Sequence, residues 1–334
     1  MTNHILELWE VMEAQNQMGL VKRLYDSSIP YHVFATFTSG DRYYGIGFTF
    51  NKDIRVDIAS FDNLKELRVS LYDDSSYVSS KLLVIELLTP SHRDTFSCLC
   101  ENLINAVKES PSEKELVRSV INQLDKWRNL FDKTKSGGLS IEQQQGLFGE
   151  LNFLHKFLSR NITAPLKALE YWVGMDAALR DFQGNEWAVE AKTTATNNPQ
   201  KVTINGERQL DESLLSELFL YHCSVEVSKF NGETLPEKVD KVRIKLKNDS
   251  PALSLFNEKL LEAGYFDEDA DLYTNRCYKI RDEHYYQIKD DFPRVKEEEL
   301  RDGVSDVKYA IILAMCSDYS IPENKLFNAI KSHE

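Results

Sequence analysis

The segment Arg180–Lys192 constrains the fold most, because it can form two short strands joined by a tight turn. Gly184-Asn185 is a favoured two-residue hairpin turn, and apolar and polar residues alternate beyond it. A hairpin centred on these two residues puts Asp181 opposite Ala188. We therefore predict a β-hairpin with one charged face and one apolar face.

The charged face is predicted from the alternation of side chains along a strand. Glu190 and Lys192 share the parity of Ala188, so we expect them on the face of Asp181, whereas Trp187 takes the other face. A register slip of one residue would send Asp181 to the opposite face, so the prediction depends on the turn. Two carboxylates and a lysine arranged in this way are the minimum set for metal-dependent hydrolysis of a phosphodiester. The alternative interpretation is a cross-strand charge cluster on the surface of a sheet.

A third carboxylate belongs to a predicted helix that precedes the hairpin. Ser140-Ile141-Glu142-Gln143 has the form of a capping box and opens a helix to about Ser159. Glu150 lies near the apolar stripe of this helix, beside Gly149 and one turn from Gly146. We expect the helix to approach the sheet here and to direct Glu150 at its charged face. A solvated surface glutamate is the alternative.

Three regions are expected along the chain. We expect residues 1–133 to form a small α+β module, and Lys135–Gly138 is the best candidate for a linker after it. Residues 134–232 are expected to form a central core, and residues 233–334 an α+β region packed on that core. The module is expected to contain a helix at Leu6–Leu24, strands at Tyr31–Thr38, Tyr43–Phe50, Leu67–Tyr72 and Leu82–Leu88, and helices at Asp94–Lys108 and Glu113–Phe131.

The rest of the chain predicts further strands and helices. Thr234-Leu235-Pro236-Glu237 is a second capping box with proline near the helix start, which favours a helix to Leu246. The alternation over Lys241–Lys247 leaves a basic strand open as an alternative. The other expected elements are a strand at Lys201–Ile204, a short polar helix at Asn205–Glu212 that carries Gln209, and strands at Phe219–Val227, Arg276–Ile288 and Lys308–Met315.

Composition limits the class of protein. The chain has 334 residues, 42% of them hydrophobic, which is enough for a core and for two or three structural units. No apolar run approaches the roughly 20 residues of a membrane helix, and the N-terminus has no signal-peptide pattern, so we expect a cytoplasmic protein without membrane partners. The five cysteines include no Cys-x-x-Cys and are expected to be reduced and buried.

Charge bears on the choice of partner. A net charge of −13 argues against nonspecific binding of nucleic acid, which depends on Lys and Arg. Residues 133–229, however, carry 10 basic and 12 acidic residues and are the least acidic part of the chain. Two of these acids would face a cation, so acidity does not exclude a nuclease.

The order helix, hairpin, short helix and strand, together with Asp181 and Glu190-Ala191-Lys192, resembles the PD-(D/E)XK nuclease superfamily, which includes many restriction endonucleases. More narrowly, the chain is similar to the bacterial "PD-(D/E)XK motif protein" family linked to restriction and phage-defence clusters. The motifs that carry this resemblance are Gly146–Leu151, Tyr171–Gly174, Asp181-Phe182, Val189–Thr194, Gln209-Leu210, Asp291–Arg294 and Gly303–Tyr309. The residue before Asp181 is Arg180, so the proline of the superfamily's name is absent.

The resemblance implies a fold and a set of roles. The fold is α/β, with a restriction-endonuclease-like core at residues 134–232 and a central mixed sheet flanked by helices. Asp181, Glu190 and the backbone carbonyl of Ala191 would bind Mg²⁺, or Mn²⁺ in its place. Lys192 would orient or help to deprotonate the attacking water, and Glu150 would act through a metal-bound water or a second metal. Gln209 would support the site or contact DNA.

The expected function is that of a Mg²⁺-dependent DNA endonuclease that belongs to a bacterial restriction or phage-defence system. Its partners would be DNA and other subunits of that system. The alternative is a catalytically inactive subunit with a nuclease-like fold that binds DNA or other proteins. Recognition sequence, strand preference and oligomeric state have no signal in the sequence.

Overall fold

The chain divides into two compact units, residues 1–137 and 138–334. The structure is a computed structural model, and it describes residues 4–15, 17–62, 64, 66–133, 138–174, 179–196, 200–213 and 215–334. Apart from Gly138, the predicted linker lies outside these ranges. Each unit is built around its own sheet, and strands from both sides of residue 232 share the sheet of the second unit.

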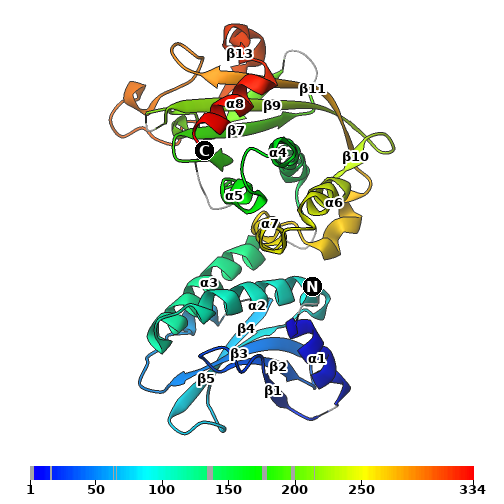
Figure 1. The fold of residues 1–334 in the computed structure, drawn as a ribbon, viewed down its shortest axis with the longest axis vertical. Helices are drawn as coiled ribbons and strands as arrows, with labels where there is room; N and C mark the ends of the chain where they lie inside the picture. The colour runs from blue at the N-terminus through cyan, green and yellow to red at the C-terminus, as the bar shows by residue number, and fades with distance from the viewer. Residues whose placement is uncertain are drawn as a thin grey trace. The chain divides into compact units, whose positions relative to one another are not determined.

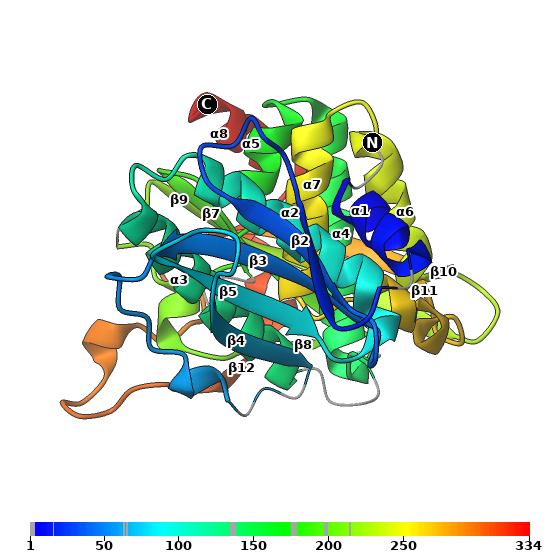
Figure 2. The ribbon, with the colours of Figure 1, turned by 90° about the horizontal axis from the view of Figure 1, so that it is seen from below.

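The first unit is a five-stranded antiparallel sheet with helices on one face (Figure 2). Its strand order is β1-β2-β3-β5-β4, and the buried rings of Trp9 and Trp127 both pack against Phe96 of α2. The elements are α1 (His4–Ala14), β1 (Leu20–Leu24), β2 (Val33–Thr38), β3 (Tyr43–Asn51), β4 (Leu67–Asp73), β5 (Ser80–Leu87), α2 (Arg93–Lys108) and α3 (Glu113–Lys133).

The predicted helix Leu6–Leu24 is wrong beyond Ala14. Gly19 adopts a φ of 85°, which a right-handed helix does not contain. The chain turns there, and Leu20–Leu24 pairs with β2 as an antiparallel edge strand. The hydrogen bonds of this pairing outweigh the helical preference of the segment.

The second unit holds a mixed sheet of order β10-β11-β9-β7-β6, in which β7 and β9 are parallel and the other pairs are antiparallel. Helices α4, α5 and α6 lie on one face of this sheet (Figure 1). The predicted α/β class with a central mixed sheet is confirmed. Its strands are β6 (Phe182–Gln183), β7 (Trp187–Thr194), β9 (Glu217–Ser228), β10 (Glu233–Thr234) and β11 (Cys277–Ile288), with β13 (Ser320–Ile321) beside β11.

The helices of this unit include two predicted by capping boxes. Ser140 caps α4 (Ile141–Arg160), and Thr234 caps α6 (Leu235–Leu246), each with both reciprocal hydrogen bonds in place. The helix at Thr234–Leu246 is therefore confirmed, and the alternative basic strand is wrong. Helices α5 (Pro165–Glu170), α7 (Ser250–Glu262) and α8 (Glu323–Ser332) were not predicted.

A separate two-stranded ribbon packs on the face of the mixed sheet opposite the one that α4 covers. Strand β8 (Lys201–Ile204) pairs with β12 (Tyr309–Ile312), and the short 3₁₀ helix η3 (Glu207–Leu210) follows β8. The predicted strand Lys308–Met315 is thus too long, because a 3₁₀ helix begins at Leu313 and buries that side chain. The predicted helix Asn205–Glu212 shortens to η3.

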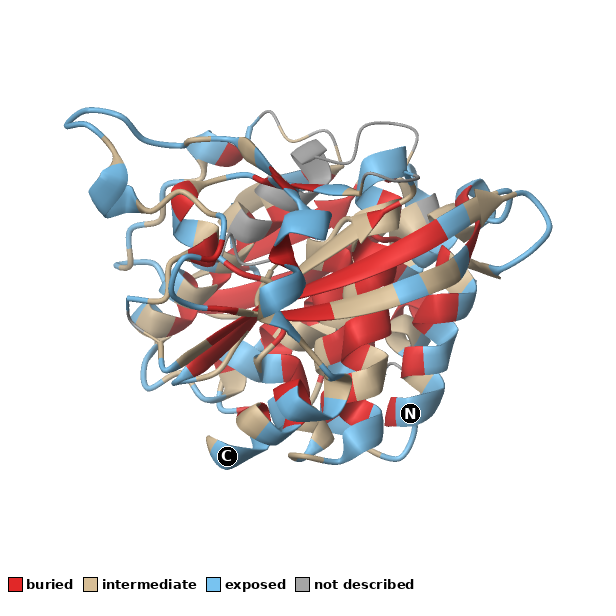
Figure 3. Cartoon of the chain, turned by 90° about the horizontal axis from the view of Figure 1, so that it is seen from above, coloured by how far each residue is buried: buried red, intermediate tan, exposed pale blue. Residues whose placement is uncertain are grey.

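Burial follows this layering. Buried positions run along the central strands and the helix sides that face them, while the projecting loops are exposed (Figure 3). Within the described ranges, no helix combines the length and the apolar character needed to cross a bilayer.

Candidate active site

The predicted hairpin is present, but its register differs from the prediction by two residues. Phe182 pairs with Val189, whereas a turn centred on Gly184-Asn185 would have paired it with Trp187. The N–H of Gly184 donates to the carbonyl of Trp187 at 2.9 Å, so the turn is centred on Asn185-Glu186. Moving the turn by one residue moves the pairing by two, and a shift of two preserves parity. The predicted face assignment therefore survives the change.

Gly184 contributes close packing rather than an unusual backbone conformation. A Cβ added there would lie 2.4 Å from the indole nitrogen of Trp187, which is closer than real side chains approach. Trp187 is 1% exposed. The glycine thus allows the Trp187 ring to fold back under the hairpin.

Asp181 lies one residue before β6 and is held by backbone groups. Its Oδ2 accepts a hydrogen bond of 2.7 Å from the N–H of Ala191. Burial raises the pKa of Asp181, and Lys192 and the Ala191 N–H only partly oppose that rise. The carboxyl group is therefore fixed at the edge of β7, with Oδ1 on the side of Gly174.

Glu190 and Lys192 lie on the same face of β7, as the parity argument predicts. The Nζ of Lys192 is 2.7 Å from Oε1 of Glu190, and the Glu190 side chain is 1% exposed. The second oxygen, Oε2, is buried and has no hydrogen-bond partner. Burial first, and then the charge of Asp181, raise the pKa of Glu190 to about 8. The pKa of Lys192 is raised because the neighbouring carboxylates outweigh its burial.

Glu150 reaches the same group of charges from helix α4. A Cβ added at Gly149 would lie 1.7 Å from Oγ1 of Thr193, so this glycine brings the helix against β7 as predicted, whereas Gly146 has open space around it. Thr193 lies on the apolar face of β7, so α4 packs on that face. The expectation that α4 would face the charged side of the hairpin, where Glu190 lies, is therefore wrong. Burial, and then Asp181, nevertheless raise the pKa of Glu150 well above its usual range.

The charges of this cluster do not balance, which bears on metal binding. Three carboxyl groups, those of Glu150, Asp181 and Glu190, meet one ammonium group, that of Lys192. Across the part of the chain that the structure describes, no three His, Cys, Asp or Glu side chains form a ready-made metal cage. Mg²⁺ does not need one, because it keeps several waters and takes one or two carboxylates.

A third protein ligand is available at the backbone. In a strand, the N–H and C=O of one residue point to the same edge. The N–H of Ala191 points at Asp181, so its carbonyl points to that edge as well. The donor set of two carboxylates and one carbonyl, with an orphaned oxygen on Glu190, therefore fits a hard divalent cation.

Gln209 also lies at the cluster. Its Oε1 is 3.4 Å from Nζ of Lys192 and accepts a hydrogen bond of 2.9 Å from the N–H of Asn205. The guanidinium of Arg180 donates to the carbonyls of Gln209 and Arg208 at 3.2 and 3.3 Å, and to that of Asp211. Arg180, at the place of the missing proline, thus ties η3 to the hairpin.

The contacts of two residues in this arrangement, Trp172 and Arg180, were not predicted from the sequence. Trp172 donates from its indole nitrogen to Oε2 of Glu150 at 2.9 Å, and Arg180 is 7% exposed with its donors on backbone carbonyls. The available signal was chemical: a buried Trp or Arg must find acceptors for its N–H groups. Neither partner could be identified from spacing alone.

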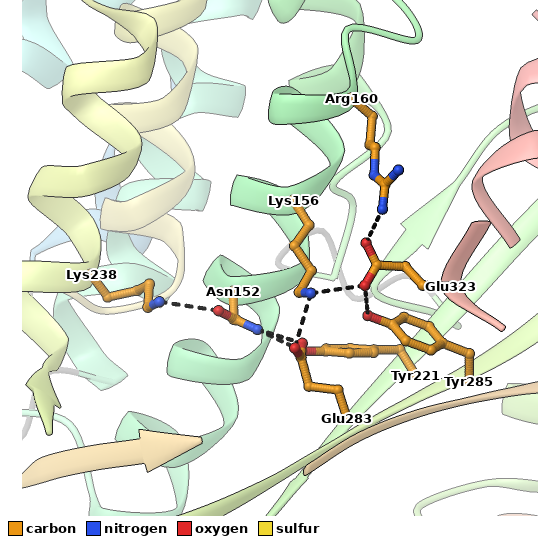
Figure 4. A network of polar contacts seen from close by, with 8 residues as sticks. All are labelled: Asn152, Lys156, Arg160, Tyr221, Lys238, Glu283, Tyr285 and Glu323. Atoms are coloured by element: carbon orange, nitrogen blue, oxygen red, sulfur yellow. Dashed lines mark hydrogen bonds and ion pairs between the residues drawn. The ribbon is translucent and has the colours of Figure 1, made fainter. Parts of the chain in front are cut away.

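A polar network fixes α4 two residues beyond Glu150 (Figure 4). Asn152 donates to Tyr221 at 2.7 Å and to Glu283 at 2.9 Å, and it accepts from Lys238 at 3.1 Å. One turn on, Lys156 bridges Glu283 and Glu323. The network joins α4 to β9, β11, α6 and α8, so it limits sliding and rotation of the helix that carries Glu150.

Comparison with known proteins gives one match. A family model described as "Putative PD-(D/E)XK family member, (DUF4420)" matches residues 5–314. No curated protein and no solved structure matches the chain.

Proposed function

The chain belongs to this nuclease-like PD-(D/E)XK family, and we propose that it is a Mg²⁺-dependent endonuclease that hydrolyses phosphodiester bonds of DNA. The residues proposed to act are Glu150, Asp181, Glu190 and Lys192, with Gln209 in support. Mn²⁺ is expected to substitute for Mg²⁺, since both prefer oxygen ligands.

The observation that carries this proposal is the orphaned Oε2 of Glu190 within a group of three carboxyls and one lysine. Buried charges are normally paired, or they coordinate a metal. Lys192 and, to a smaller extent, Arg180 offset the charge of Glu190. The pKa values of Glu150, Asp181 and Glu190 are nevertheless all raised, so their charged forms are not fully compensated, and a divalent cation would supply the missing positive charge. Membership of the PD-(D/E)XK family and the uncompensated charge of the three carboxyl groups both support a metal-dependent nuclease.

The chain's own groups have distinct tasks in this proposal. Asp181, Glu190 and the Ala191 carbonyl would hold Mg²⁺, which when bound supplies Lewis-acid activation of the scissile phosphate. The ammonium of Lys192 has three N–H donors, and Glu190 and Gln209 take two of them. The third remains for the attacking water or for a phosphate oxygen, where it would stabilise the charge of the transition state.

DNA as the substrate is supported by the outer face of the β8–β12 ribbon. Alternation along the two strands exposes Lys201 and Thr203 of β8 and Ala310 and Ile312 of β12, and Lys308, directly before β12, is exposed as well. No acidic residue of the two strands shares that face of the ribbon. Among the described residues, neither lysine takes part in an ion pair. In a chain of net charge −13, such a face is complementary to a phosphate backbone.

This face adjoins the proposed active site. Asn205 follows β8 directly, and its N–H donates to the same Gln209 oxygen that lies 3.4 Å from Lys192. Tyr309 of β12 also lies within the electrostatic influence of Lys192. A strand of DNA on the ribbon would therefore lead to Lys192.

The decisive experiment is cleavage of a supercoiled plasmid with Mg²⁺ or EDTA, for the wild type and Lys192→Ala. We expect nicking by the wild type with Mg²⁺ only, and a rate lower by about 100-fold or more in the variant. Metal-dependent nicking that Lys192→Ala leaves unchanged would indicate a contaminant or another site. Binding of DNA without any cleavage would support the inactive-subunit alternative.

We also propose that the enzyme serves a bacterial restriction or phage-defence system. The support is the resemblance of the motifs around Glu150, Asp181 and Glu190-Ala191-Lys192 to a family linked with such systems. Running the plasmid assay on methylated and unmethylated DNA tests it. A clear rate difference between the two substrates supports this role, and equal rates argue against it.

A further inference from the structure

The segment Trp172-Val173-Gly174 contacts both Glu150 and Asp181, which come from different elements. The indole N–H of Trp172 donates to Oε2 of Glu150 on α4 at 2.9 Å. Trp172 is fully buried, and its backbone bridges that of Phe182 at the start of the hairpin. One residue thus joins the helix to the hairpin.

The next two residues hold Asp181 itself. The N–H groups of Val173 and Gly174 both donate to the backbone carbonyl of Asp181, at 2.9 and 3.1 Å. At Gly174 a Cβ would lie 2.9 Å from Oδ1 of Asp181 and 3.2 Å from its Cα. The absence of a side chain at Gly174 therefore leaves the room that the Asp181 carboxylate occupies.

We propose that Trp172 is a positioning residue, which holds the Glu150 carboxylate at a fixed place relative to Asp181 for metal binding. The inference rests on the proposed metal-dependent function. Glu150 and Asp181 repel each other when both are charged. Among the described residues, Trp172 is the one side chain that hydrogen-bonds to Glu150. A neutral N–H donor opposes this separation and leaves the negative charge available for the cation.

The indole suits this task better than a cation would. A lysine or arginine at this place would neutralise Glu150 and compete with the metal. The indole has a single donor and no acceptor, so Oε2 is engaged and Oε1 stays free. The rigid ring also packs against Phe256, at a centroid distance of 6.0 Å, which fixes the direction of its N–H.

The test is Trp172→Phe, with Trp187→Phe as the matched control. Both changes replace a buried indole near the site by a smaller phenyl ring, but only Trp172→Phe removes the N–H donor to Glu150. Calorimetry with Mg²⁺ should show affinity lower by about 10-fold or more for Trp172→Phe. Trp187→Phe should stay near the wild type. Equal affinities for the two variants would overturn the proposal.

A second background separates positioning from loss of fold. In Glu150→Gln protein, Trp172→Phe should cause no further loss of Mg²⁺ affinity, because the residue on which it acts has changed. A full additional loss would assign the effect to packing and overturn the proposal. Thermal unfolding of all variants gives the folded fraction.

If Trp172→Phe does not fold, the wild type still gives a test. The chain has four tryptophans, so an NMR spectrum should contain four indole N–H signals. One of these signals should shift when Mg²⁺ is added and should also shift in the variant Glu150→Ala. No common shift would overturn the positioning role. If the wild type binds Mg²⁺ and nicks DNA but Trp172→Phe keeps full Mg²⁺ affinity, the positioning role is wrong and the proposed function stands. If the wild type neither binds Mg²⁺ nor nicks DNA, both the proposed function and the positioning role are wrong.

Discussion

The carboxylate of Asp181 accepts a 2.7 Å hydrogen bond from the backbone N–H of Ala191, across a hairpin whose regular pairing ends at Phe182. Asp181→Asn keeps an oxygen acceptor for that N–H and removes the charge. We expect a correctly folded protein with Mg²⁺-dependent nicking lower by about 100-fold or more. Plasmid cleavage measures the rate.

The companion variant Asp181→Ala separates the two roles of this side chain. It removes the acceptor as well as the charge, so it should lower the free energy of unfolding by about 1–2 kcal/mol relative to Asp181→Asn. Urea unfolding of both variants measures this difference. Equal stabilities would mean that the hydrogen bond to Ala191 does not stabilise the hairpin.

Mg²⁺ should stabilise the protein through Glu190. A ligand that binds only the folded state adds about 2.7 kcal/mol at a concentration 100 times its Kd. We expect Mg²⁺ to raise the melting temperature of the wild type and to leave that of Glu190→Gln nearly unchanged. Glu186→Gln, in the turn of the same hairpin, is the control and should keep the full shift. A similar shift in both variants would place the metal elsewhere.

The polar network behind α4 predicts a pH dependence of stability. Burial tends to raise the pKa of Glu323, but hydrogen bonds from Arg160, Lys156 and Tyr285 outweigh it and lower the pKa to about 2, from an ordinary value of 4.5. The folded pKa is depressed, so Glu323 stabilises the fold above pH 4.5 and the contribution is lost as pH falls towards 2.

Glu323→Gln removes this contribution. The side chain is 26% exposed, so we expect a loss of only about 1–2 kcal/mol at neutral pH. The difference in unfolding free energy between wild type and variant should shrink between pH 4.5 and 2. Glu170→Gln, which breaks an exposed pair with Lys167, should cost less than about 0.5 kcal/mol. A pH-independent difference for Glu323→Gln would contradict the assignment.

The predicted charged face of the hairpin survived an error in the turn because the register moved by two residues and not by one. Parity alone puts Glu190 and Lys192 together, and the shift of two residues in register keeps that parity. The position of the turn could not be predicted from Gly184. This glycine is required by the close approach of the Trp187 ring and not by the conformation of the turn. A contact of one side chain with the backbone three residues earlier has no signature in spacing.

Other parts of the site depend on contacts between distant segments. The helix with Glu150 was predicted from its capping box and apolar stripe, which are local signals. The partners of Trp172 and Arg180 come from α4 and η3, which are 22 and about 29 residues away. In the first unit, pairing with β2 overrode the helical pattern at Leu20–Leu24. Local patterns thus predicted many of the helices and strands, but not α5, α7, α8 or β1, and they did not predict the long-range hydrogen bonds of the site.

Gly149 and Gly146 form a matched pair on α4. A Cβ at Gly149 would lie 1.7 Å from Oγ1 and 3.0 Å from Cβ of Thr193, so Gly149→Ala must move the helix or Thr193. We expect a loss of about 1–3 kcal/mol in unfolding free energy. Gly146→Ala meets nothing within 4 Å and should stabilise the helix by about 0.5–1 kcal/mol. Effects of the same sign would show that α4 does not need close contact with β7.

The ribbon face and the exposed side of α6 offer two alternative surfaces for DNA. Lys201 begins β8 and Lys308 precedes β12, on the ribbon that we propose leads to Lys192. Lys245 and Lys247 instead lie on and just after α6, whose packing partner α4 covers the other face of the sheet. Each backbone contact contributes about 0.9 to the slope of log affinity against log salt. We expect the double change Lys201→Gln and Lys308→Gln to weaken binding of a labelled duplex and to reduce the slope by about 2. Fluorescence anisotropy with Ca²⁺ in place of Mg²⁺ measures the affinity and its dependence on salt.

The double change Lys245→Gln and Lys247→Gln is the control, because it removes equal charge from α6. It should change the affinity and the slope little, and a larger effect from this pair than from Lys201→Gln and Lys308→Gln would place DNA on α6 instead.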